Sequence, residues 1–89
     1  MKIKESKNLT YQRLPSIRGY ETSDRIEPSK CLLESFDSID DKIELHFKNG
    51  REAIISAKNL QGERELDLIA EKLPHFLDKS YEDILDIDI

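Results

Sequence analysis

The stretch Lys42-Ile-Glu-Leu-His-Phe-Lys-Asn-Gly-Arg-Glu-Ala-Ile-Ile-Ser-Ala57 decides the fold, because it has the pattern of two strands joined by a tight turn. Ile43, Leu45 and Phe47 alternate with polar residues, which is the two-residue period of a strand with one dry face and one wet face. An Asn-Gly pair at positions 49 and 50, flanked by such alternation, is the strongest short signal for a β-hairpin. The sequence therefore predicts an antiparallel hairpin over residues 42–57.

The turn of this hairpin fits two registers. A two-residue loop sets Leu45 opposite Ile54, whereas a three-residue loop with Gly50 in the left-handed conformation sets Leu45 opposite Ala53. We favour the second register because it buries more apolar surface, and a shift of one residue moves every side chain of a strand to the other face. Ile54 is then expected on the outer face of the sheet.

A further strand is expected before the hairpin. Residues 29–39 contain Leu32, Leu33 and Phe36, and the pair Asp40-Asp41 is a suitable turn into Lys42. The alternation of apolar residues is imperfect, which indicates either a β-bulge or cover on both faces. Together with the hairpin, this strand gives a three-stranded antiparallel meander.

The segment after the hairpin has the apolar stripe of an amphipathic helix. Apolar residues recur there at three- and four-residue steps: Leu66, Ile69, Ala70, Leu73, Phe76 and Leu77. We expect the helix to begin near Asn59 or Gly62 and to end or kink at Pro74, which has no amide hydrogen to donate. Ser80 has the spacing of an N-cap for a second, short helix from Tyr81 to about Leu85.

The first 29 residues lack any sustained apolar period, so we expect a basic leader that is extended or disordered. Residues 2–14 are the part of it that could add an edge strand. The expected fold is α+β: a three-stranded meander covered by one amphipathic helix, a short C-terminal helix and the leader. We therefore divide the chain into the leader, 1–29, and a single small domain, 30–89.

Length and composition set the broad class of the protein. The chain has 89 residues, of which 37% are hydrophobic and 37% are charged, so we expect one soluble domain with a small core. A homodimer would enlarge such a core. The single cysteine, Cys31, cannot form an internal disulfide, which fits a reducing cytoplasm. We expect neither a signal peptide nor a membrane span.

The net charge of −5 is unevenly distributed along the chain. Residues 1–30 hold seven Lys or Arg against four Asp or Glu, whereas residues 31–89 hold seven against fifteen. Such a division is typical either of an arm that docks on its own body or of two surfaces with different partners.

The residue types that carry catalysis or bind metals show no favourable spacing. Cys31, His46 and His75 would have to converge through the fold to form a nucleophilic or zinc site. The acids Asp37, Asp40 and Asp41 cluster in a turn that lacks the ligand spacing of a calcium loop. We expect a protein without enzymatic activity, cofactor or metal.

Two binding surfaces remain as hypotheses. The acidic C-terminal segment offers apolar anchors within a charged rim, which is typical of protein interfaces; the predicted contact residues are Tyr81, Glu82, Asp83, Ile84 and Asp86. The alternative for the apolar members is that they close the core. The leader interleaves aromatic residues with Arg13, Arg18 and Arg25, which could contact phosphates.

The sequence therefore favours a non-catalytic acidic module that binds another protein, with a basic partner favoured. A neutralising inhibitor of the immunity or antitoxin type is one form of such a module. The alternative is a nucleic-acid-associated accessory protein that contacts phosphates through its basic leader. The acidic body argues against this alternative, because it would repel a polyanion.

Overall fold

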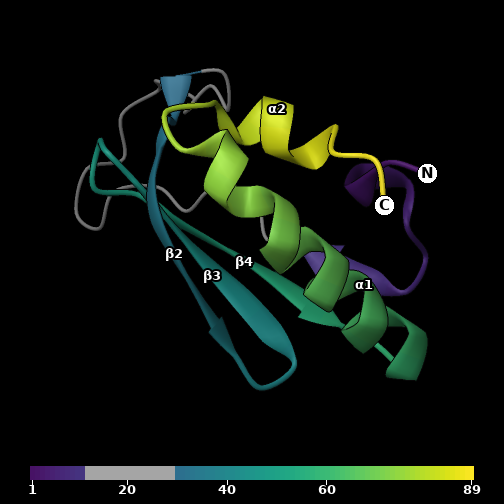
Figure 1. Cartoon of the computed structure of the whole chain (residues 1–89). Coiled ribbons are helices and arrows are strands. Elements are labelled where there is room, and N and C mark those ends of the chain that lie inside the picture. The colour runs from purple at the N-terminus through teal and green to yellow at the C-terminus, as the bar shows by residue number, and fades with distance from the viewer. Residues whose placement is uncertain (12–29) are drawn as a thin grey trace, which may run out of the picture.

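Four antiparallel strands form one sheet in the computed structural model, which describes residues 1–11 and 30–89 (Figure 1). The strands lie in the order β1-β4-β3-β2. Their bounds are Leu9–Tyr11 for β1, Leu33–Ile39 for β2, Lys42–Phe47 for β3 and Glu52–Ala57 for β4. The α+β class is as predicted, but the sheet has four strands where the sequence predicted three.

The β3–β4 hairpin has the three-residue loop that the sequence favours. Leu45 lies opposite Ala53, and Gly50 adopts a φ of +84°, in the left-handed region that glycine reaches without steric cost. This register directs Ala53 into the core and leaves Ile54 half-buried on the outer face. The predicted register is confirmed.

The imperfect alternation in β2 has a structural cause. The pairing of β2 with β3 shifts between Leu33 and Ser35, which is the irregularity of a β-bulge. The extra residue places Leu33 and Phe36 on the same face of the sheet despite their odd spacing, so both pack against the core. The predicted turn at Asp40-Asp41 joins Ile39 to Lys42.

The N-terminal segment, residues 1–11, belongs to the folded domain. It contains a short 3-10 helix, η1 (Ile3–Glu5), and then β1, which pairs with β4. Ile3 is completely buried and Leu9 nearly so. The structure thus bears out the alternative that residues 2–14 add an edge strand, and not an undocked leader, for these residues. Two isolated apolar side chains obtain tertiary contacts that offset the cost of ordering. The remainder of the predicted leader lies outside the described residues.

In the described part of the chain, two helices and the 3-10 turn between them cover one face of the sheet (Figure 1). Helix α1 (Leu60–Lys72) begins at its N-cap Asn59, whose side chain accepts the Gly62 N–H at 2.9 Å. It ends before Pro74 and continues as η3 (Leu73–Phe76), as the proline predicts. Helix α2 (Tyr81–Leu85) has the predicted Ser80 cap, which accepts the Asp83 N–H at 3.1 Å.

The core lies between these helices and the inner face of the sheet. Its completely buried apolar side chains come from both ends of the chain as well as from the middle: Ile3, Cys31, Leu33, Ile43, Leu45, Ile55, Ile69, Leu73 and Ile84. A small domain with a single core of this kind has a low free energy of unfolding, so the cost of a substitution at any tightly packed position is a large fraction of it.

At Gly62, helix α1 lies very close to the backbone of the N-terminal segment. A Cβ atom at this position would lie 2.2 Å from the Asn8 carbonyl oxygen and 3.1 Å from the Ala57 Cβ. Neither neighbour can yield easily, because Asn8 O accepts the Lys58 N–H at 2.8 Å and Ala57 sits in β4. Only glycine fits this contact.

We predict that Gly62→Ala destabilises the protein by about 1–3 kcal/mol through overpacking. In a helix without such a contact, the same substitution stabilises by up to about 1 kcal/mol, so the sign of the change is diagnostic. Urea unfolding measures it, with Gln61→Ala at the exposed neighbouring position as the control. A Gly62→Ala protein as stable as the wild type would show that the N-terminal segment does not pack here.

Candidate functional site

The two ends of the described chain lie side by side (Figure 1). The Ile3 N–H donates to the Ile87 carbonyl at 3.1 Å, and the Ile89 N–H donates to the Met1 carbonyl at 2.8 Å. These bonds form an isolated antiparallel bridge between Lys2 and Asp88. Residues 86–89, in which acidic and apolar side chains alternate, thus pair with residues 1–3 as a short extended segment.

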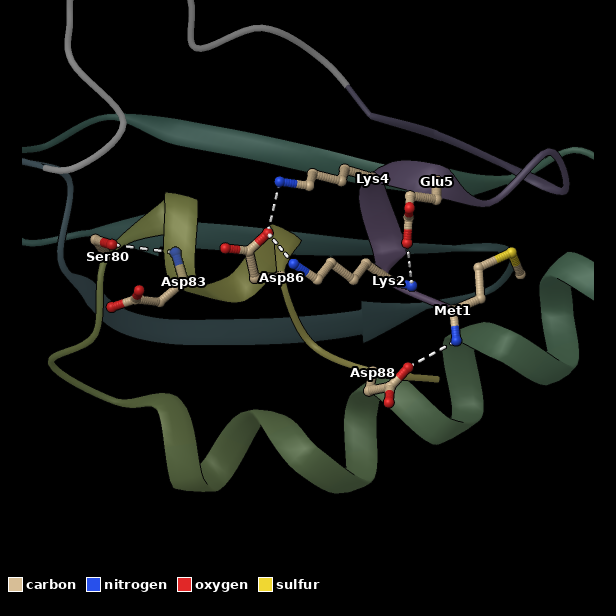
Figure 2. Close-up of polar contacts among 8 residues, drawn as sticks. All are labelled: Met1, Lys2, Lys4, Glu5, Ser80, Asp83, Asp86 and Asp88. Carbon is tan, nitrogen blue, oxygen red and sulfur yellow. Dashed lines mark hydrogen bonds and ion pairs between the residues drawn. The ribbon is translucent and has the colours of Figure 1, made fainter.

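Ion pairs join the same two segments (Figure 2). Lys4 Nζ lies 2.7 Å from Asp86 Oδ1, and Lys2 Nζ lies 3.7 Å from the same atom. The N-terminal ammonium group of Met1 lies 2.7 Å from Asp88 Oδ1. The uneven charge of the sequence therefore has a structural outcome, because the basic N-terminal segment docks on the acidic end of its own body.

These pairs shift the pKa values of their members. The hydrogen bond and charge of Lys4 hold the pKa of Asp86 below its ordinary value, although partial burial of the carboxyl opposes the shift. Asp86 in turn raises the pKa of Lys4. The N-terminal ammonium lowers the pKa of Asp88 in the same way. Because Asp86 Oδ1 is shielded from solvent, the two lysines are its main electrostatic partners.

A buried carboxylate holds the N-terminal segment from the other side. Glu65 on α1 is only 4% exposed, and it accepts hydrogen bonds from the Ser6 hydroxyl and from Asn8 Nδ2, the latter at 2.9 Å. Asn8 Oδ1 accepts a further bond from Asn59 Nδ2 at 3.0 Å. A buried carboxylate is costly unless it is hydrogen-bonded, so this network ties the segment firmly to α1.

The predicted contact residues of the C-terminal segment divide into two groups. Tyr81 and Ile84 are buried, and the ring centroid of Tyr81 lies 5.3 Å from that of Phe47. They close the core, which was the alternative considered for them, and burial raises the pKa of the Tyr81 hydroxyl. Glu82 and Asp83 are exposed in the first turn of α2.

We define the α2 acidic surface as Glu82, Asp83 and Asp86. Figure 2 shows Asp83 beside the Ser80 cap and Asp86 turned toward Lys2 and Lys4. Within residues 1–11 and 30–89, neither Glu82 nor Asp83 forms an ion pair. Both lie at the N-terminal end of α2, where acids are favoured. The surface therefore combines two exposed acids with Asp86, which already pairs with Lys2 and Lys4.

The other chemistry-bearing residues lie apart. Cys31 is buried, and its sulfur receives a hydrogen bond from Asn49 Nδ2 at 3.2 Å. His46 lies on the outer face of the sheet, 3.2 Å from Asp37 and 3.3 Å from Glu52, whereas His75 lies in η3. Within residues 1–11 and 30–89, no group of three or more His, Cys, Asp or Glu side chains is placed to hold a metal ion.

Sequence reasoning located the acidic segment but missed the side chains that bind it. Lys2 and Lys4 were assigned to a leader, and only the division of charge between leader and body pointed to their docking. The arginines of the alternative hypothesis, Arg13, Arg18 and Arg25, lie outside the described residues.

None of the helices in the described part of the chain is long and apolar enough to cross a membrane. Comparisons with family models, with curated proteins and with solved structures find no match to this chain. Its function has to be inferred from its own residues.

We predict that the contribution of Asp86 to stability disappears in acid. A carboxyl whose pKa is lowered by folding binds fewer protons in the folded state, so its stabilisation is present above the ordinary pKa of 3.8 and is lost as the pH falls through the lower folded value. Wild type should therefore be more stable than Asp86→Asn near neutral pH, and the two should converge at about pH 2.

Urea unfolding at low salt, repeated from neutral pH downward, measures this difference. The control is Asp67→Asn, which removes an exposed carboxylate of α1 and should show no comparable convergence. A constant difference between wild type and Asp86→Asn at every pH would contradict the ion pair with Lys4.

Proposed function

We propose that the protein is a non-catalytic binding module that receives a basic segment of another protein on its α2 acidic surface. The proposal concerns Glu82 and Asp83 as the contacting residues, with Asp86 as the neighbouring site for a basic side chain. Tyr81 and Ile84 support this surface from the core and do not themselves contact the partner.

The observation that carries the proposal is the contact between Asp86 and the two lysines of the N-terminal segment. Lys4 reaches Asp86 at 2.7 Å from a short 3-10 turn, and its backbone neighbours pair with residues 87–89. This end of the domain is thus chemically suited to a basic segment. Glu82 and Asp83 extend the same negative surface beyond the contact with the N-terminal segment, residues 1–11.

The charge of the body supports a basic partner. Residues 31–89 carry a net charge of −8, from seven Lys or Arg and fifteen Asp or Glu. A negative potential of this kind speeds the encounter with a basic surface and disfavours acidic competitors. Exposed acids contribute mostly to the association rate and to salt dependence, so the interaction should weaken as salt is added.

A finer form of the proposal is a neutralising inhibitor of the immunity or antitoxin type, acting in the cytoplasm. A small acidic module suits the masking of a basic active surface, because its charges complement those that hold an anionic substrate. Cys31, the single cysteine of the sequence, is buried, which is in keeping with a reducing compartment.

The nucleic-acid alternative draws less support from composition. Residues 12–29 hold three arginines, but Glu21, Asp24 and Glu27 balance them, so the segment has no net positive charge. The basic excess of the N-terminal third instead lies in residues 1–11 and Lys30, and part of it pairs with Asp86. A protein partner is therefore the stronger proposal.

We predict that Glu82→Lys/Asp83→Lys abolishes capture of the partner from a nuclease-treated lysate of the source cell. Wild type should retain a basic protein at low salt and release it as salt is raised, since screening weakens exposed charge pairs. The matched control, Asp67→Lys/Glu71→Lys, makes the same change of charge on the exposed face of α1 and should retain the protein.

Two further arms make the result decisive. Glu82→Gln/Asp83→Asn, which removes the charges without reversing them, should weaken capture less than the reversal does. Equal loss in the α1 control would show that only net charge matters, and equal retention by all variants would contradict the proposed surface. Capture that disappears on nuclease treatment would favour the nucleic-acid alternative.

A further inference from the structure

Strand β2 is the outer strand of the sheet on the side away from β1 (Figure 1). Its turn to β3 has two residues, so Ile39 and Lys42 form a hydrogen-bonded pair, and such pairs alternate with non-hydrogen-bonded ones along the ladder. Phe36 and Ser38 therefore turn their backbone N–H and C=O groups away from β3. Within the described residues, no backbone hydrogen bond from another segment reaches these groups.

The beginning of the same edge already accepts an added strand. The Leu33 N–H donates to the Lys79 carbonyl at 2.8 Å, and the Leu33 carbonyl accepts the Asp78 N–H at 2.9 Å. Leu32 and Ser80 form an antiparallel bridge at this point. Asp78 has a φ of +68° at the point where the chain arrives at this edge from η3, before it continues into α2. Residues 34–39 thus continue an edge whose first part is paired.

The charged side chains along this edge are acidic, so they favour a binding segment with basic side chains. Glu34 and Asp37 are exposed on β2, which has no Lys or Arg, and Asp40 and Asp41 follow in the turn. Ile39 is 41% exposed and offers an apolar contact beside them. Two copies of β2 would bring like charges together, which disfavours pairing between copies.

We propose that residues Phe36–Ile39 of β2 bind an extended basic segment of another protein by strand addition. Main-chain hydrogen bonds to Phe36 and Ser38 provide the affinity, and the acids select lysine or arginine at alternate positions of the segment. This edge is distinct from the α2 acidic surface, and the inference does not depend on the function proposed for that surface.

The test uses the full-length protein and a peptide of about six residues that alternates lysine with valine. Hydrogen exchange followed by NMR should show that the peptide protects the Phe36 and Ser38 amides. A peptide that alternates lysine with proline has the same charge but lacks half of the backbone donors, and it should not protect them. Equal protection by both peptides would show that charge alone causes the binding, without main-chain hydrogen bonds, and would overturn the proposal.

Ser38→Pro is the decisive variant. It removes an N–H that points away from β3, so the internal ladder is kept while the edge loses a donor. We expect about a tenfold loss of affinity for the lysine–valine peptide, whereas Ser38→Ala, which keeps the N–H, should bind as the wild type does. Unchanged binding by a folded Ser38→Pro protein would overturn the inference.

Two further variants cover the remaining outcomes. If Ser38→Pro does not fold, Glu34→Lys/Asp37→Lys should weaken the same peptide by a similar factor, and unchanged affinity would overturn the proposal. Glu82→Lys/Asp83→Lys should leave the protection of Phe36 and Ser38 intact, which separates this edge from the α2 acidic surface. If the Phe36 and Ser38 amides become more protected as the protein concentration rises, without peptide, then a second copy of the chain binds this edge. That result would also overturn the proposal.

Discussion

The carboxylate of Glu65 is buried in α1 and accepts its hydrogen bonds from Ser6 and Asn8, far away in sequence. Without these donors, a desolvated acid would remain beneath the helix, which is among the costliest defects a small core can have. The glycine at position 62 lets the backbone of Asn8 approach α1 closely enough for the bonds to form. Burial of Ile3 and the pairing of β1 with β4 follow from the same docking.

This docking also shapes the surface that a partner meets. It brings Lys2 and Lys4 onto Asp86 and so neutralises part of the acidic end of the domain. Exposed acids lie beside that contact on α2, along the outer strand β2 and on the exposed face of α1. The protein therefore presents its negative charge at the margins of its folded core, where charge steers association without the cost of burial.

Much of the fold follows from local pattern. The hairpin register, the Asn59 and Ser80 caps and the end of α1 before Pro74 were predictable, because each depends on residues that are neighbours in sequence. The fourth strand was anticipated only as a possible edge strand within residues 2–14, since β1 has three residues and gains its stability from pairing with β4. The same limit applies to the site, because alternation cannot show whether Tyr81 faces the core or solvent. The uneven charge offered docking of the N-terminal segment as one of two interpretations, beside two surfaces with different partners.

Native-state hydrogen exchange tests the central claim, that residues 1–11 fold cooperatively with the rest of the domain. The Ile3 amide donates to Ile87 and the Lys58 amide donates to Asn8, so both bonds exist only when the segment is docked. The account predicts that these two amides exchange with the same opening free energy as the amide of Leu45 at the centre of the sheet. Fast exchange at Ile3 and Lys58, with Leu45 still protected, would show a segment that detaches on its own and would contradict the account.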